Sequence, residues 1–110
     1  MNRYANYHAH VYFDEPTRER AARLCTGAAK LHNVLMGRVH SRRVGPHPRR
    51  SCQLSFEAAQ FDRLILRLEA NRGGLTVLVH GQTGNALRDH TANAAWLGEP
   101  AILNLAMFGG

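Results

Sequence analysis

The chain contains few residues of several types, and each shortage excludes some classes of protein. In 110 residues it has 1 tryptophan, 2 cysteines and a single lysine, Lys30, and its 8 acidic residues face 14 basic ones. Cys25 and Cys52 lie far apart in the sequence and in no metal-ligand spacing. We therefore expect reduced, buried thiols, with no disulfide between them and no zinc bound to them.

Long apolar runs are also missing. No stretch is long enough to cross a bilayer, and residues 1–4 do not begin a hydrophobic signal segment. We therefore expect a soluble protein that stays in the cytoplasm and has no membrane partner. A length of 110 residues with 45% hydrophobic residues predicts a single domain over residues 1–110.

Positive charge is what the chain has in excess. The formal net charge is +6, and arginines are densest between residues 38 and 50. Such a segment is a solvated edge, a nucleic-acid contact or a binding site for an acidic small molecule, because arginine binds carboxylates through two hydrogen bonds. If it folds toward a site, these arginines could bind a substrate carboxylate: Arg42, Arg43, Arg49 and Arg50.

Residues 7–13, Tyr-His-Ala-His-Val-Tyr-Phe, have the aromatic and β-branched composition of a strand. Side chains two positions apart leave a strand from one face, so His8, His10 and Tyr12 share a face and the apolar residues take the other. Imidazole is a common metal ligand and a proton carrier near neutral pH. The pair suggests a site, although an exposed sheet face also accepts histidine.

The rest of the chain alternates between helical and strand periods. Helical spacing of apolar residues extends from about residue 16 to residue 35 and from 57 to 71, while 38–44, 51–56 and 75–80 have strand patterns. The β-α-β-β-α-β order predicts an α+β fold, a ferredoxin-like split β-α-β with a C-terminal extension. Right-handed crossovers give the strand order four, one, three, two, with both helices on one face of an antiparallel sheet.

This topology brings a third histidine to the first two. The fourth strand lies antiparallel to the first, so His80 should lie close to His8 and His10 on the face that the helices leave open. Imidazoles that face the same way from neighbouring strands predict one divalent metal. Its ligands would be His10 and His80, with His8 or His47 as the third.

Several separated segments resemble the DOPA 4,5-dioxygenase family, in the right order and over nearly the whole chain. They are residues 7–14, 44–48, 71–80, 83–84, 89–91 and 96–98. One position departs from the family pattern: Gly81 follows His80 where a proline is expected, which changes the rigidity of that turn. The resemblance implies a ferredoxin-like fold and an extradiol ring-cleaving oxidoreductase that uses non-haem iron(II) and dioxygen on a catechol such as L-DOPA.

Within that resemblance, other polar residues take candidate roles. Three histidine ligands leave open positions for a catechol and dioxygen, and zinc or another divalent metal would suit the same ligands. Asp89 could complete the site with a carboxylate, or could simply form a turn or cap. His47 and His90, both in family-like segments, are candidates to take and return the catechol proton. Tyr12 and Arg49 are candidates to bind the substrate.

Other interpretations stay open. A module that binds metal without catalysis, or one that binds nucleic acid, would share the topology. An RNA-binding sheet needs aromatic residues on its open face, and here Tyr12 stands alone among histidines, which argues against nucleic acid as a partner. We expect His32 and His40 at the surface and Trp96 as a packing residue.

The segment after residue 81 bears on quaternary structure. It is short for covering the open face, yet it is rich in large apolar side chains: Trp96, Leu97, Ile102, Leu103, Leu105, Met107 and Phe108. Monomers rarely leave such a patch in water. We therefore expect a homodimer that buries the open face or its rim and shields the histidines from solvent. In the alternative, this tail folds back over its own sheet.

Overall fold

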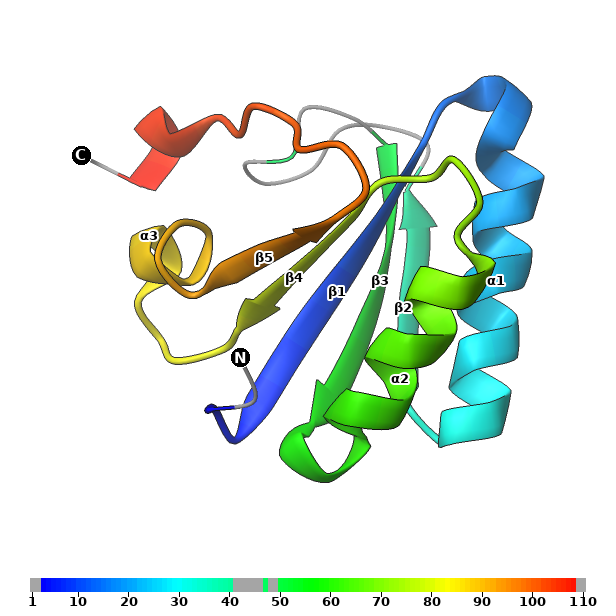
Figure 1. Ribbon diagram of the computed structural model, residues 1–110. Coiled ribbons are helices and arrows are strands. Elements are labelled where there is room, and N and C mark those ends of the chain that lie inside the picture. Colours follow the sequence, from blue (N-terminus) through cyan, green and yellow to red (C-terminus); the bar gives the residue numbers. More distant parts are fainter. Residues whose placement is uncertain (1–2, 41–46, 48–49, 109–110) are drawn as a thin grey trace.

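A computed structural model describes residues 3–40, 47 and 50–108 (Figure 1). Three of the arginines named above, Arg42, Arg43 and Arg49, lie outside the described residues. The described elements, in chain order, are β1 (Asn6–Phe13), the 3₁₀ helix η1 (Glu15–Thr17), α1 (Arg18–His32), β2 (Leu35–His40), β3 (Arg50–Glu57), α2 (Ala58–Asn71), β4 (Val77–Gly81), α3 (Ala86–Asp89), β5 (Ala94–Leu97) and the 3₁₀ helix η2 (Leu105–Phe108).

Within the described residues, five strands form one antiparallel sheet in the order β2-β3-β1-β4-β5. The predicted order of four, one, three, two is confirmed, and the histidine strand β1 lies between β3 and β4. The sequence did not predict β5, a short strand that pairs with the outer edge of β4. The architecture is the α+β, ferredoxin-like fold that the element order predicted.

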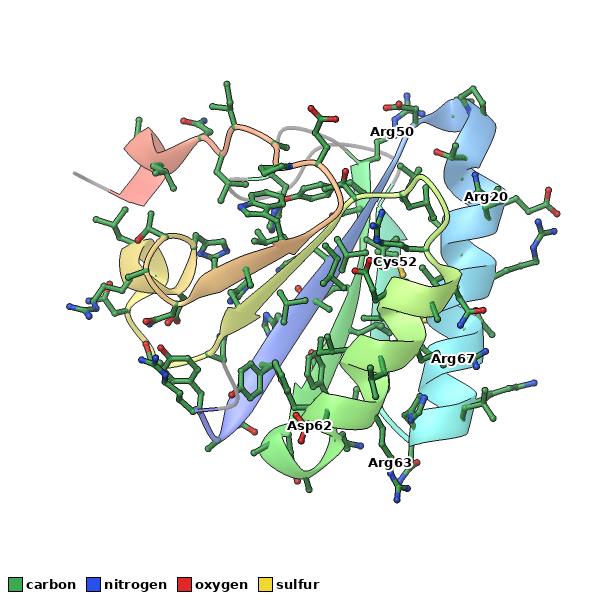
Figure 2. All side chains as sticks on the ribbon, in the orientation of Figure 1. Arg20, Arg50, Cys52, Asp62, Arg63 and Arg67 are labelled. Carbon is green, nitrogen blue, oxygen red and sulfur yellow. The ribbon has the colours of Figure 1, made fainter. Side chains whose placement is uncertain are left out.

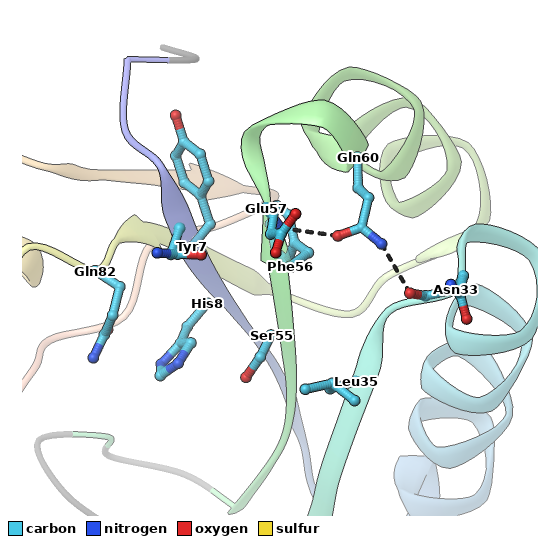
Figure 3. A pocket seen from close by; sticks show the side chains of 10 residues that line it. Tyr7, His8, Asn33, Leu35, Ser55, Phe56, Glu57, Gln60 and Gln82 are labelled. Carbon is cyan, nitrogen blue, oxygen red and sulfur yellow. Dashed lines mark hydrogen bonds between the residues drawn. The ribbon is translucent and has the colours of Figure 1, made fainter.

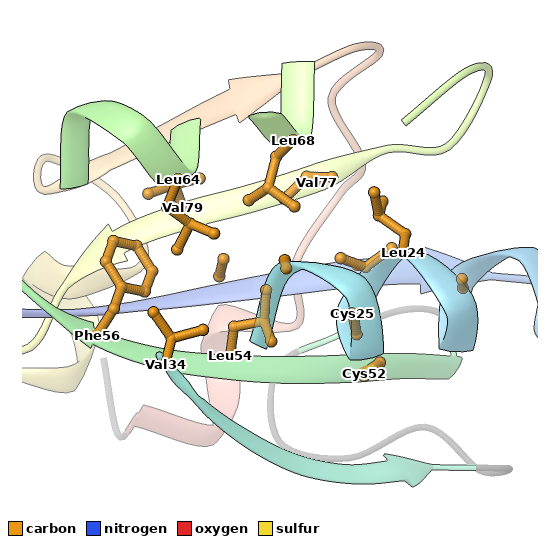
Figure 4. Packing of buried hydrophobic residues seen from close by; sticks show 14 of the residues in the cluster. Leu24, Cys25, Val34, Cys52, Leu54, Phe56, Leu64, Leu68, Val77 and Val79 are labelled. Carbon is orange, nitrogen blue, oxygen red and sulfur yellow. The ribbon is translucent and has the colours of Figure 1, made fainter. Parts of the chain in front are cut away.

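Helices α1 and α2 cover one face of the sheet (Figure 1). In α2, Phe61, Leu64 and Leu68 recur at helical spacing and are buried, whereas Leu66 on the opposite side is 72% exposed. Each buried leucine contributes about 1.5–3 kcal/mol by leaving water. Figure 4 shows the core between helices and sheet, which includes Leu24, Cys25, Cys52, Leu54, Phe56, Leu64, Leu68, Val77 and Val79. Both cysteines are free and buried, as expected.

The predicted C-terminal end of the first helix was wrong. Asn33 takes the left-handed conformation with φ of 53°, and α1 ends at His32. Leu35, which was expected on the apolar face of the helix, therefore begins β2 and is 75% exposed. Gly37 lies within β2, where the register with β3 shifts between Met36 and Val39.

The C-terminal segment partly covers the open face. Trp96 on β5 pairs with Leu78, and its ring centroid lies 6.0 Å from that of Tyr12. The hydroxyl of Thr76 donates to the carbonyl oxygen of Glu99 at 2.9 Å, which fixes the chain after β5 beside β4. Further on, Ile102 is 91% exposed. Among the described residues, no helix has the length and apolarity needed to cross a membrane.

Candidate metal centre

The centre of the site is the pairing of β1 with β4. In this register His8 lies opposite His80 and His10 lies opposite Leu78, so the three histidines leave the open face together, as predicted. His10 and His80 are diagonal neighbours whose rings can meet, and their Nε2 atoms lie 2.9 Å apart. His10 is 5% exposed and His80 is 1% exposed, whereas His8 is half-buried.

Two further histidines reach the same place from connecting segments. His47 lies between β2 and β3, and its ring centroid is 4.0 Å from that of His10. His90 is the C-cap of α3, and its ring centroid is 4.3 Å from that of His80. The structure thus brings together the histidines that the sequence singled out for the site. His32 is not among them, because it belongs to α1 in the helical layer.

The described residues contain two groups of potential metal ligands, and the two groups share one residue. His8, His10 and His80 form the strand triad, and His10, His47 and His90 form the loop triad. In each triad the ligand atoms lie within 4.8 Å of one another. A neutral imidazole has one lone pair for a metal, so His10 can serve only one triad at a time. With one ion in either triad, two of the five histidines do not ligate it.

Backbone carbonyls fix two of these rings. Nδ1 of His80 lies 2.9 Å from the carbonyl oxygen of Gly81, and Nδ1 of His90 lies 2.7 Å from that of Ala86. A carbonyl oxygen only accepts, so Nδ1 of each ring carries the proton and donates it. Nε2 then keeps the lone pair that a metal or a substrate proton requires, which is the usual outer-sphere arrangement of a ligating histidine.

Gly81, where the resemblance led us to expect a proline, makes contacts that a proline could not keep. Its N–H donates to the carbonyl oxygen of Asn93 at 3.0 Å, and a Cβ at this position would lie 2.6 Å from the ring of Tyr4. A proline has no N–H to donate, and its ring would clash with Tyr4. The glycine therefore permits this packing while its carbonyl oxygen holds His80.

Burial lowers the pKa values of the three strand-triad histidines. Desolvation, followed by repulsion from His47 and His80, holds the pKa of His10 well below its ordinary value. Burial lowers the pKa of His80 to about 4, and burial with repulsion from His90 also lowers the pKa of His8. Neutral imidazoles at neutral pH are the form that binds a metal without first losing a proton. The all-nitrogen donor set fits iron(II), zinc and related divalent metals.

Tyr12 is fully buried on the same face, and its hydroxyl lies 2.6 Å from Nδ1 of His47. This contact orients the His47 ring, and either atom can be the donor because a phenol and an imidazole nitrogen can each donate or accept. Parity placed Tyr12 on the correct face, but its bond to His47 had no sequence signal. Substrate binding by Tyr12 stays a prediction.

Asp89 holds the segment that carries His90. Its carboxylate accepts hydrogen bonds from the backbone N–H of Thr83 at 2.9 Å, the Thr83 hydroxyl at 2.6 Å and the Asn93 side chain at 3.0 Å. Burial alone would raise the pKa of Asp89, but these bonds bring it below its ordinary value. Among described residues Asp89 belongs to neither ligand triad. Sequence reasoning missed Thr83 and Asn93 as its partners, although Thr83 lies in a family-like segment.

Arg50 is the one of the four candidate carboxylate-binding arginines that the structure describes. Its Nη1 donates to Oε2 of Glu15, the first residue of η1, at 2.6 Å, and Figure 2 labels the Arg50 side chain. This pair is largely exposed, so it contributes at most about 1 kcal/mol. Arg49, the predicted substrate-binding arginine, lies outside the described residues, and its role stays a prediction.

Fold and site together define a class: a ferredoxin-like α+β protein whose open sheet face carries a buried imidazole cluster suited to a divalent metal. A profile of the Dopa 4,5-dioxygenase family matches residues 7–107. The chain belongs to that family.

Individual relatives agree with this assignment. The chain is 33% identical over 109 residues to the "DOPA 4,5-dioxygenase" of Amanita muscaria, covering 91% of this chain and 48% of that protein. It is 40% identical over 72 residues to an "Uncharacterized 21.2 kDa protein" of Botryotinia fuckeliana, covering 58% of this chain and 39% of that protein. The matched region thus spans about half or less of the length of these curated relatives.

A solved structure is similar over nearly its full length. The crystal structure of a "putative dioxygenase" from Nostoc punctiforme superposes with a TM-score of 0.92 at 40% sequence identity. The match covers 96% of this chain and 92% of that one.

Proposed function

We propose that this protein is an extradiol ring-cleaving dioxygenase that acts on a catechol such as L-DOPA with dioxygen and histidine-bound iron(II). The observation that carries the proposal is the approach of His10 and His80, whose buried Nε2 atoms lie 2.9 Å apart while Nδ1 of His80 is held by a carbonyl oxygen. Family membership supports an oxidoreductase that uses a small-molecule substrate.

The strand triad is the better candidate for the metal ligands. His8 and His10 lie on β1 and His80 lies on β4, two hydrogen-bonded strands at the centre of the sheet. Regular elements hold side chains more exactly than loops, and metal ligation tolerates small errors in position poorly. Iron(II) at these ligands would supply the redox and Lewis-acid chemistry that ring cleavage by dioxygen requires. Zinc or another divalent metal at the same ligands is the alternative.

The loop histidines would then not ligate the metal and could handle protons. Nδ1 of His90 donates to the carbonyl oxygen of Ala86, and His47 is oriented by the hydroxyl of Tyr12. Either ring could take a proton from a catechol hydroxyl and return it to the product as a general base and acid. Tyr12 and Arg49 remain our candidates for contacts with the substrate.

A homodimer in the cytoplasm is the remaining part of the proposal. Large apolar side chains stay exposed in the described residues, namely Leu31, Leu35, Leu66, Leu87 and Ile102. A two-fold interface that buries the rim of the open face would remove part of this surface from water. Light scattering at micromolar concentration tests it: twice the mass of 12.3 kDa supports the dimer, and 12.3 kDa across the range refutes it.

The enzyme assay begins with the protein purified without oxygen. We expect reconstitution with one iron(II) per chain and uptake of dioxygen when a panel of catechols is added. A protein that retains zinc and consumes no oxygen with any catechol after iron loading would instead be a metal-binding module without this activity.

A further inference from the structure

Beside the candidate metal centre, the protein surface has a recess with a volume of about 500 Å³. It lies where β1 begins and β3 ends, and His8 forms part of its wall (Figure 3). This volume is within the range of small-molecule sites, which is about 300–1,000 Å³. The recess and the strand triad therefore share one residue, His8.

The register of the sheet explains this contact. Ser55 on β3 lies opposite His8 on one side, and Leu35 on β2 lies opposite Ser55. These three side chains form one row across the open face that continues to His80 on the other side of His8. In Figure 3 the side chains of Leu35, Ser55, His8 and Gln82 lie on the same side of the sheet. The half-buried His8 is thus the point where the buried triad reaches the recess.

The lining has a definite chemistry. Ser55, Gln82 and Asn6 offer hydroxyl and amide groups, Leu35 offers an apolar surface, and Glu57 offers a carboxylate. Among the described residues that line the recess, none is lysine or arginine. A carboxylate brought here would meet no cation from these residues and would face Glu57, whereas a hydroxyl or ammonium group would find acceptors.

We propose that this recess binds the ring substituent of the catechol, and that it selects uncharged polar or ammonium substituents over carboxylates of similar length. The inference rests on the proposed function, because the ring must sit at the strand triad for its substituent to reach past His8. Leu35 and Ser55 are then residues that determine substrate specificity.

The test uses three catechols that differ only at the end of a short side chain: dopamine, 3,4-dihydroxyphenylethanol and 3,4-dihydroxyphenylacetate. Unsubstituted catechol is the reference. Binding is measured by calorimetry without oxygen, and kcat/KM is measured from oxygen uptake by the iron-loaded protein. We expect the amine and the alcohol to bind at least about threefold more tightly than the acid, a modest ratio because Glu57 is exposed.

Leu35→Trp is the variant that fills the recess, and Leu66→Trp is its matched control, because the two leucines are 75% and 72% exposed and Leu66 lies on the outer side of α2. Leu35→Trp should weaken the binding of the substituted catechols about tenfold relative to the binding of catechol itself. Leu66→Trp should leave the ratio of these affinities at the wild-type value.

The outcomes separate the two proposals. If the protein consumes oxygen with catechol but Leu35→Trp weakens the binding of every compound equally, the proposed substituent site is wrong and the proposed dioxygenase activity stands. Tightest binding of 3,4-dihydroxyphenylacetate would also show that the proposed substituent site is wrong. The absence of oxygen uptake with any catechol would overturn the proposed function, and the calorimetric ratios would still decide whether the recess recognises the substituent.

Discussion

The two faces of β1 are both buried, but by different chemistry. Toward the helices the strand presents Ala9, Val11 and Phe13, which pack into the apolar core. On the open face it presents His10 and Tyr12, buried almost as fully among imidazole rings and a phenol. Burial of the apolar side chains on the helix-covered face stabilises the fold. Burial of the titratable side chains on the open face costs their hydration and creates the candidate metal site. Changes on one face should therefore affect folding, and changes on the other should affect metal binding.

Removal of His10 should have the largest effect. His10 belongs to both triads among the described residues, so His10→Ala removes a ligand whichever triad holds the ion. We expect iron to be lost and oxygen uptake to fall by at least about 100-fold, since even outer-sphere changes cost 10–100-fold. Metal analysis and oxygen uptake measure this, with His32→Ala on α1 as the histidine control. Full iron content in His10→Ala would contradict the site.

His47→Ala should separate proton transfer from metal binding. We expect turnover to fall by about 10²–10⁴-fold, the usual contribution of a general acid or base, while iron content stays near that of the wild type. The Tyr12→Phe variant, which removes the hydroxyl that contacts His47, should lower kcat by a smaller factor. Iron loss in His47→Ala would make this residue a ligand.

On the helix-covered face, Leu54→Ala should act on folding. Leu54 is fully buried in the core, and such a substitution lowers the free energy of unfolding by about 2–5 kcal/mol through lost burial and the cavity left behind. Urea unfolding of the metal-free protein measures this change. The fraction of Leu54→Ala that stays folded should still bind iron. Loss of iron by the folded variant would contradict the claim that the core face affects folding and the open face affects metal binding.

The pH dependence of stability should give the smallest effect. The folded-state pKa of His80 is about 4, below its ordinary value of 6.5. Between these values the unfolded chain binds a proton that the folded chain does not, so stability rises with pH from about 4 to 6.5. The slope from one histidine is at most about 1.4 kcal/mol per pH unit. In the metal-free protein, His80→Gln should reduce this slope, and an unchanged slope would contradict the assignment.

Local patterns and topology predicted the faces of β1 and the approach of His80, because side-chain alternation and strand order follow from short-range rules. The end of α1 was missed because the apolar spacing continues to Leu35, although Lys30 and His32 followed by Asn33 are a pattern typical of a helix end. Strand β5 was missed because a segment of four residues gives little periodic signal. The bonds of Tyr12 to His47 and of Asp89 to Thr83 depend on how separate segments meet, which periodicity does not encode.

The most direct test of the central claim compares His80→Ala with His90→Ala. The two rings lie 4.3 Å apart, and each donates Nδ1–H to a backbone carbonyl, so the variants are closely matched. They differ in the triad to which each residue belongs. Both variants are titrated with iron(II) in the absence of oxygen. If the metal binds in the strand triad, His80→Ala should lose tight iron binding and His90→Ala should retain one iron per chain. Loss of iron in His90→Ala with full binding in His80→Ala would place the metal in the loop triad and contradict this account.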